Sequence, residues 1–278
     1  MRAFHIYSTA PFFAKNPGKD PLIDKSEAYC TVLSALEWRK HNGEIHMITD
    51  KHGAGLFNRL GIVSVWDRLE DTLAPDVGGI DPLMFWAGAK LLALRDFPAP
   101  CVMLDTDFIV WERLDLSDKM TAAHEEELNP DIYPNISRFQ LREYTFPDNL
   151  DLSVKPLNTA FLYIPDEDFK LYYTSQAAAF MRSAVRSDDF LTYMVFAEQR
   201  LLPMLAKKCG IEYGTLLNKD YLFFPQDKFT HLWGAKQAMR DDPSESEKFC
   251  NKCKNRILSD FPEYSFVVNN IEEFYSGC

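Results

Sequence analysis

The stretch Cys101–Val110 constrains the fold of this chain more than any other part of the sequence. Its apolar first half runs directly into Asp105 and Asp107, and a second apolar run follows them. Short apolar runs bounded by turn residues, here Pro98 and Pro100, are typical of buried strands. In open α/β sheets, ligands bind at the carboxyl ends of the strands. The sequence therefore predicts an inner strand that carries a carboxylate pair at its ligand-binding edge.

The carboxylate pair itself indicates a metal. Two carboxylates separated by one residue and set against a hydrophobic sheet repel each other unless a cation joins them. Hard oxygen ligands of this kind suit magnesium or manganese. The arrangement of Asp105, Thr106 and Asp107 thus predicts a divalent ion that bridges the oxygens of a diphosphate.

Charge and composition exclude several classes of partner. The chain has 278 residues and a formal net charge of -11, which argues against nucleic acid and anionic membrane surfaces. No apolar segment approaches the roughly 20 residues of a membrane span. We expect the first residues to form a strand and not a signal peptide. The six cysteines are scattered like reduced thiols, so we expect a cytoplasmic protein. Cys250 and Cys253 have no two further zinc ligands at suitable spacing, so we do not expect a structural zinc site there.

Apolar periodicity and turn residues predict alternating strands and helices. The expected strands are 3–8, 45–49, 62–66, 101–104, 156–164 and 221–225, and the expected helices are 27–41, 51–60, 83–94, 168–185, 189–209 and 244–258. Asp188–Asp189 and Asp241–Asp242 are expected to cap helices. This order predicts an α/β fold with a mixed, mostly parallel central sheet flanked by helices.

We expect a single domain over residues 1–278, since no repeat or linker divides the chain. Residues 1–113 would form a Rossmann-like nucleotide-binding half that contains the Asp pair. Residues 114–278 would form an acceptor-side half with a helical C-terminal tail. Residues 114–151 contain many Pro and Asn, which predicts an irregular lid or insertion over the site.

Five motifs follow one another in a recognisable order. A first strand ends in a polar turn, and a lysine precedes the Asp pair. After the Asp pair comes a strand that begins with Asn. An acid–Gln pair that opens a helix follows, and a motif of His, Gly and Lys comes after it. The first four are Tyr7-Ser8-Thr9, Lys90, Asp105-Thr106-Asp107 and Asn158-Thr159-Ala160-Phe161, and the fifth has two parts, Glu198-Gln199 and His231 to Lys236. In these motifs the chain resembles nucleotide-sugar glycosyltransferases of the GT-A fold, most closely the retaining family eight. It resembles a divergent member, because Ala160 replaces Gly, Glu198 replaces Asp, and the last motif is one residue shorter.

The resemblance implies a GT-A fold and a hexosyltransferase-type activity. A sugar would pass from a nucleoside diphosphate sugar, usually a UDP-sugar, to a glycan or other hydroxyl acceptor with retained configuration. A cytoplasmic enzyme of this type would take part in polysaccharide biosynthesis. The implied ligands of Mn²⁺ (or Mg²⁺) are Asp105, Asp107 and His231. The implied catalytic residues are Glu198, Gln199 and Lys236. The implied substrate-binding residues are Tyr7, Ser8, Thr9, Lys90, Thr106, Asn158 and Gly234.

Two other functions fit parts of the same pattern. A phosphatase of the haloacid-dehalogenase type also follows a strand with Asp-x-Asp, but that motif normally opens the chain, and here a nucleotide-binding half precedes it. A protein of the same fold that binds sugar nucleotides or glycans without turnover is the second alternative. The altered positions Glu198 and Lys236 would both touch the reaction centre, so the sequence leaves this alternative open.

Overall fold

The computed structural model describes residues 1–74, 76–116, 118–218, 227–232 and 234–277. The strand expected at 221–225 lies outside these residues. Within the described ranges, no helix combines the length and the apolar character that crossing a membrane requires.

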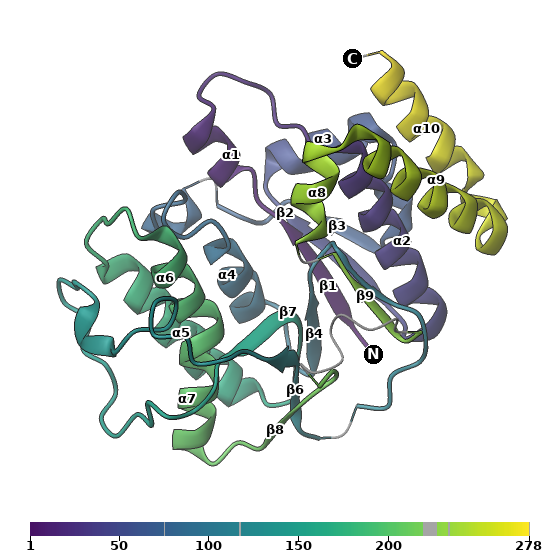
Figure 1. The fold of residues 1–278 in the computed structure, drawn as a ribbon. Helices are drawn as coiled ribbons and strands as arrows, with labels where there is room; N and C mark the ends of the chain where they lie inside the picture. Colours follow the sequence, from purple (N-terminus) through teal and green to yellow (C-terminus); the bar gives the residue numbers. More distant parts are fainter. Residues whose placement is uncertain (75, 117, 219–226, 233, 278) are drawn as a thin grey trace.

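A mixed sheet forms the centre of the molecule (Figure 1). Among the described residues it has seven strands in the order β3-β2-β1-β4-β7-β6-β8. β7 is antiparallel to both of its neighbours, and every other neighbouring pair in this order is parallel. The strands are β1 Ala3–Tyr7, β2 Ile45–Thr49, β3 Arg68–Glu70, β4 Cys101–Leu104, β6 Met120–Glu125, β7 Leu157–Ile164 and β8 Tyr213–Thr215. The predicted α/β class with a mixed, mostly parallel central sheet is confirmed.

Helices cover both faces of this sheet (Figure 1). One face packs against α2 (Lys25–His41), α3 (Lys51–Leu60), α9 (Pro243–Asp260) and α10 (Ser265–Ser276). The other face packs against α4 (Gly88–Asp96), α5 (Glu167–Ser183), α6 (Phe190–Val195) and α7 (Leu201–Cys209). The short helices are α1 (Ala10–Lys15), α8 (Ala235–Asp241), and the single turns η1 (Val63–Val65), η2 (Val77–Gly79), η3 (Ile136–Arg138) and η6 (Pro262–Tyr264).

The strand β4 shows why the sheet needs helices on both sides. Val102 and Leu104 belong to the core on the α2 side, whereas Cys101 and Met103 belong to the core on the α4 side. Side chains of a strand point alternately to its two faces, so a strand that is apolar at every position must be buried on both. All four residues are fully buried. The apolar run read from the sequence is therefore an inner strand.

Local boundaries follow the expected chemistry at several helix starts. The side chain of Asp189 accepts a hydrogen bond from the Thr192 N–H at the start of α6. The side chain of Asp242 accepts one from the Ser244 N–H at the start of α9. Each cap satisfies a backbone donor that has no partner within the helix. The two predicted caps at these positions are confirmed.

Two predicted elements on the nucleotide-binding side are wrong in part. Residues 62–66 form no strand; they contain η1, and the paired strand β3 follows at Arg68–Glu70. Ile62, Val65 and Trp66 are buried from this turn, so the apolar residues reach the core without pairing as a strand. The helix expected at 83–94 begins only at Gly88, because Asp81 accepts hydrogen bonds from the N–H groups of Leu83 and Met84 and holds a turn there.

The second half also departs from the prediction. Residues 114–151 are not wholly irregular, since β6 lies within them and pairs with β7 and β8. The single helix expected at 189–209 is divided into α6, a π turn at Phe196–Arg200 (η4) and α7. Pro203 in the first turn of α7 has no N–H, so it cannot complete a continuous α-helical ladder through this segment.

An aromatic cluster anchors the segment that follows β6. The ring of Phe180 in α5 lies within 6.2 Å, centroid to centroid, of Phe139, Tyr144, Phe146, Phe196 and others. Phe180 is fully buried. Each such ring pair adds stabilisation beyond the burial of apolar area. The segment predicted to be a lid is therefore fastened to α5 through its aromatic residues.

We predict that Phe180→Ala lowers the free energy of unfolding by about 3–5 kcal/mol, because it removes a buried ring and leaves a cavity. Urea denaturation followed by circular dichroism measures this loss. Phe266→Ala is the matched control, since Phe266 is 46% exposed in α10, and we expect it to cost less than about 1 kcal/mol. Equal losses in the two variants would show that the cluster does not anchor the segment.

Candidate functional site

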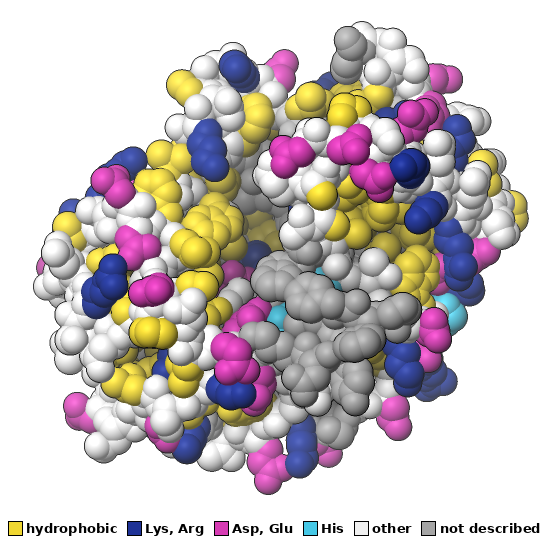
Figure 2. Space-filling model, viewed as in Figure 1, with side chains coloured by type: hydrophobic (Ala, Val, Ile, Leu, Met, Phe, Trp, Pro, Cys, Tyr) yellow, Lys and Arg dark blue, Asp and Glu magenta, His cyan; other side chains and the backbone are white. Residues whose placement is uncertain are grey.

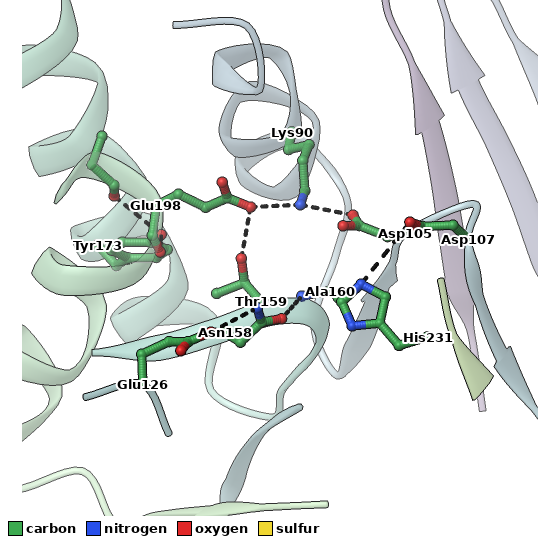
Figure 3. Close-up of polar contacts among 11 residues, drawn as sticks. Lys90, Asp105, Asp107, Glu126, Asn158, Thr159, Ala160, Tyr173, Glu198 and His231 are labelled. Atoms are coloured by element: carbon green, nitrogen blue, oxygen red, sulfur yellow. Dashed lines mark hydrogen bonds and ion pairs between the residues drawn. The ribbon is translucent and has the colours of Figure 1, made fainter. Parts of the chain in front are cut away.

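The site lies where the carboxyl end of β4 meets the amino end of β7. The antiparallel register pairs Leu104 with Phe161, and the Asp105 N–H donates to the Ala160 carbonyl at 2.8 Å. Because β7 alone is reversed among the described strands of this sheet, its first residues reach the edge at which β4 ends. Asp105 and Thr159 are therefore brought to the same edge from opposite strand directions (Figure 3).

Lys90 joins two carboxylates at this edge. Its Nζ lies 2.7 Å from Asp105 Oδ1 and 2.5 Å from Glu198 Oε1. The Thr159 hydroxyl donates to the same Glu198 oxygen at 2.7 Å. Figure 3 shows the Lys90 ammonium between the two acids. Burial disfavours the charge of Lys90, but Asp105 and Glu198 together raise its pKa above the usual value, so the ammonium stays charged.

Asp107 has its own pair of partners, which come from the far end of the chain. β5 (Phe108–Val110) and β9 (Phe229–His231) form a second, two-stranded sheet that pairs Phe108 with His231. This pairing places His231 Nε2 4.0 Å from Asp107 Oδ2. Lys236 Nζ, from the first turn of α8, lies 2.9 Å from the same oxygen. The sequence-distant His and Lys therefore do meet the Asp pair.

The charges of these groups follow from burial and from their neighbours. Burial, with repulsion from Asp107 and Glu198, raises the pKa of Asp105 to about 6 against the pull of Lys90. Burial would also raise the pKa of Asp107, but Lys236 and His231 outweigh it and lower the pKa below its usual value. Burial lowers the pKa of His231 to about 4. The imidazole is thus neutral near pH 7, which is the form that binds metals.

The donor atoms suit a divalent ion, although no finished metal centre is present among the described residues. The part of the chain that the structure describes contains no group of three or more His, Cys, Asp or Glu side chains gathered to hold a metal. The separation of His231 Nε2 and Asp107 Oδ2, 4.0 Å, is compatible with one ion about 2.1 Å from each atom. Lys90 forms an ion pair with Asp105, and Lys236 forms one with Asp107, so a metal ion would compete with these two ammonium groups.

The residues predicted to bind the nucleotide at the end of β1 are differently engaged. Thr9 is buried, and its N–H and hydroxyl donate to the Asp50 carboxylate at 2.6 and 2.8 Å. The Ser8 hydroxyl accepts from the Ala10 N–H at 3.3 Å. Tyr7 is half-buried against the edge of Phe57. The groups of Thr9 are thus already used to hold Asp50, which also caps α3.

The remaining predicted substrate residues hold local structure as well. Asn158 Oδ1 accepts from the Ala160 N–H at 3.0 Å, and its amide donates to Glu126 Oε1 at 3.3 Å. Gly234 has a φ of 75°, in the left-handed region that favours glycine, where it precedes α8. Thr106 is half-buried in the turn between Asp105 and Asp107.

Glu198 and Gln199 do not open a helix, and Glu198 is not on an exposed face. Both lie in the π turn, and Glu198 is only 6% exposed. Gln199 Oε1 accepts from the Tyr133 hydroxyl at 2.6 Å. π turns occur often at functional sites. Sequence periodicity does not reveal this one, because residues 190–206 are apolar at most positions and a change of helical phase leaves no visible break in such a run.

Sequence reasoning missed three neighbours of this site. Glu126 contacts Asn158, Tyr133 contacts Gln199, and the Tyr173 hydroxyl donates to the main-chain oxygen of Glu198 at 2.8 Å. Glu126 and Tyr133 come from the segment predicted to be irregular. Glu126 belongs to an acidic run at the end of β6, a strand that the sequence did not predict. Tyr173 is an apolar-face residue of α5 in the sequence and carries no signal of its own.

The surface around the site is hollowed. Figure 2 shows a depression between the side of the molecule that carries α4 and α6 and the side that carries α8 and α9. Acidic and basic side chains are visible in its floor, and hydrophobic side chains gather on the wall nearer to α4 and α6. A ligand would enter between the two halves of the molecule.

Several solved structures are similar to this chain at low identity. PaToxG Glycosyltransferase is 10% identical, with 91% of this chain and 77% of that chain covered and a TM-score of 0.43. The inositol-1-phosphate CTP transferase from T. maritima is 14% identical, with 91% and 96% covered and a TM-score of 0.40. The glycosyltransferase GlyE in Streptococcus pneumoniae TIGR4 is 11% identical, with 78% and 45% covered and a TM-score of 0.36. TM-scores below 0.5 do not establish a shared fold, so neither a fold family nor an activity follows from them.

Comparison at the sequence level identifies a family. No curated protein matches the sequence. The model of a family of unknown function, DUF6734, matches residues 23–271, which exclude β1 but include the other strands of the sheet and the candidate site residues from Lys90 to Lys236. The chain therefore belongs to this family of unknown function, DUF6734.

Proposed function

We propose that this protein is a metal-dependent glycosyltransferase that takes a sugar from a nucleoside diphosphate sugar. The observation that carries the proposal is that Asp107, with His231 and Lys236 beside it, lies two residues after the Asp105 that pairs with Lys90 at the carboxyl end of an inner strand. Open α/β sheets bind ligands at this edge. The GT-A fold, the likeness to retaining family eight, and a UDP-sugar as donor are parts of the same proposal.

The charge of the site supports a metal. Three carboxylates, those of Asp105, Asp107 and Glu198, face the two ammonium groups of Lys90 and Lys236, which leaves the described centre negative. A nucleoside diphosphate is also negative, so the two would repel each other. A divalent cation held by Asp105, Asp107 and His231 reverses the local charge. Oxygen-rich ligands with one imidazole suit Mn²⁺ or Mg²⁺.

In the proposed transfer, several residues of the chain would have separate roles. A bound divalent ion would supply Lewis-acid stabilisation of the leaving diphosphate. Lys236 is 34% exposed and could leave Asp107 to offset charge on the departing phosphate. Lys90 holds the side chains of Asp105 and Glu198 close to each other. The carboxylate of Glu198 would stabilise positive charge that develops at the anomeric carbon.

We propose transfer with retained configuration, in which the acceptor hydroxyl attacks on the face from which the diphosphate leaves. Tyr133 contacts Gln199, and Glu126 contacts Asn158. In this proposal these side chains would form the acceptor side and contact a glycan or other hydroxyl acceptor. The cytoplasmic setting and the role in polysaccharide biosynthesis expected from the sequence belong to this proposal too.

A protein that binds sugar nucleotides without turnover is the second candidate. The observation that favours it is that Lys90 is already paired with both Asp105 and Glu198, at 2.7 and 2.5 Å. A carboxylate paired in this way stabilises a developing positive charge less strongly. Turnover separates the two candidates, because only the transferase releases the nucleoside diphosphate from its sugar.

We predict that Asp107→Asn abolishes metal-dependent binding of UDP. Changes outside the ligand sphere alone weaken metal binding about 10- to 100-fold, so loss of a ligand is expected to weaken UDP binding in the presence of Mn²⁺ by roughly 100-fold or more. Isothermal titration calorimetry with UDP, with and without Mn²⁺, measures this. Asp168→Asn in α5 is the matched control, since Asp168 is exposed and away from the site. Binding of UDP that is equally tight after chelation of all metal would contradict the proposed role of the ion.

We predict that Glu198→Gln lowers kcat for nucleoside diphosphate sugars roughly 100- to 1,000-fold, because it removes charge from the reaction centre. Gln can still accept from Lys90 and Thr159, so we expect the fold and the affinity for UDP to change little. Release of UDP from a panel of UDP-sugars in the presence of Mn²⁺ is the measurement. Glu247→Gln, at an exposed position of α9, is the control.

The same assay tests the alternatives to transfer. Binding of UDP with no turnover of any sugar nucleotide would favour the binding protein. Release of phosphate from sugar phosphates, with no turnover of sugar nucleotides, would favour the phosphatase. Either result would remove the transferase proposal.

A further inference from the structure

Tyr173 lies directly behind the proposed reaction centre without touching a substrate site. It is fully buried in α5. Its hydroxyl donates to the main-chain oxygen of Glu198 at 2.8 Å and lies 3.3 Å from that of Ala197 (Figure 3). Burial, followed by the charge of Glu198, raises the pKa of the phenol well above its usual value. The hydroxyl therefore keeps its proton and remains a donor.

Pro203 limits the helical donors that are available to the main-chain oxygen of Glu198. The Leu201 N–H donates to the Phe196 oxygen, which is the spacing of five residues that defines a π turn. At that spacing the partner of the Glu198 oxygen would be residue 203, which is Pro203 and has no N–H. A buried carbonyl without a partner costs free energy. The hydroxyl of Tyr173 supplies a donor to this oxygen from outside the segment.

The same turn decides where two neighbouring side chains point. Successive side chains of an α-helix differ by about 100° in direction, and the wider π turn reduces this angle. Glu198 reaches Lys90 and Thr159, while Gln199, the next residue, reaches Tyr133 on the acceptor side. A regular helix through this segment would turn one of the two away from the site.

We propose that Tyr173 is a positioning residue: its hydroxyl holds the π turn in the geometry that presents Glu198 to the reaction centre. The inference rests on the proposed function for its effect on catalysis. Its structural content, the coupling of Tyr173 to the Glu198–Lys90 ion pair, is independent of any activity. No bond to a substrate is involved, so Tyr173 acts only through Glu198.

Tyr173→Phe removes one hydroxyl and keeps the ring. We expect kcat for the sugar-nucleotide substrate to fall at least about tenfold, with KM for the donor changed less than about twofold. Tyr275→Phe is the matched control, because the hydroxyl of Tyr275 also donates to a main-chain oxygen, that of Ile23 at 2.6 Å. We expect it to leave kcat unchanged. An equal effect of the two variants on kcat, or no effect of Tyr173→Phe, would overturn the proposal.

A stability cycle tests the coupling without any assay of activity. The urea midpoint is measured for the wild type, Tyr173→Phe, Lys90→Met and the double variant. Residues that share one network give non-additive effects. We expect the shift caused by Tyr173→Phe to shrink to less than half in the Lys90→Met background.

The two experiments separate the failure of this inference from the failure of the proposed function. Coupling in the stability cycle with no turnover of any sugar nucleotide would support the positioning of Glu198 and overturn the transferase. Turnover in the wild type with fully additive midpoint shifts would support the transferase and overturn the role of Tyr173.

Discussion

The ammonium group of Lys90 is the interaction on which the candidate site depends. It lies in the first turn of α4, where the helix dipole disfavours positive charge. Asp105 and Glu198 offset this cost, and removal of either acid would leave a buried charge without full compensation. Three elements from different parts of the chain are therefore held to one another by a single cation.

The reversed strand β7 makes this meeting possible. In a wholly parallel sheet, the residues at the start of a strand lie at the edge opposite the ligand-binding edge. Because β7 is antiparallel to β4, the residues Asn158 and Thr159 lie beside Asp105 instead. The site thus receives side chains from the end of one strand and from the beginning of its neighbour, and both are rigid elements of the sheet.

The π turn is the second device that shapes the site. Pro203 interrupts the helical ladder beside it, and the hydroxyl of Tyr173 donates to the main-chain oxygen of Glu198 within it. Together they direct Glu198 to the side of Lys90 and Gln199 to the side of Tyr133. The donor and acceptor sides of the proposed reaction centre are therefore set by two consecutive residues of one turn.

The sequence by itself determined the inner strand at Cys101–Leu104, the Asp pair at its end and the alternating α/β order, because these depend on local apolar pattern and on the two-residue period of strands. It also indicated that Lys90, His231 and Lys236 belong near that pair. Only the tertiary structure decided that Lys90 joins Asp105 to Glu198, that β6 lies within the supposed lid, and that Tyr173 supports the π turn. These features arise from contacts between residues about 15 to more than 100 positions apart. Such contacts do not alter the apolar periodicity of either segment, so the sequence pattern cannot reveal them.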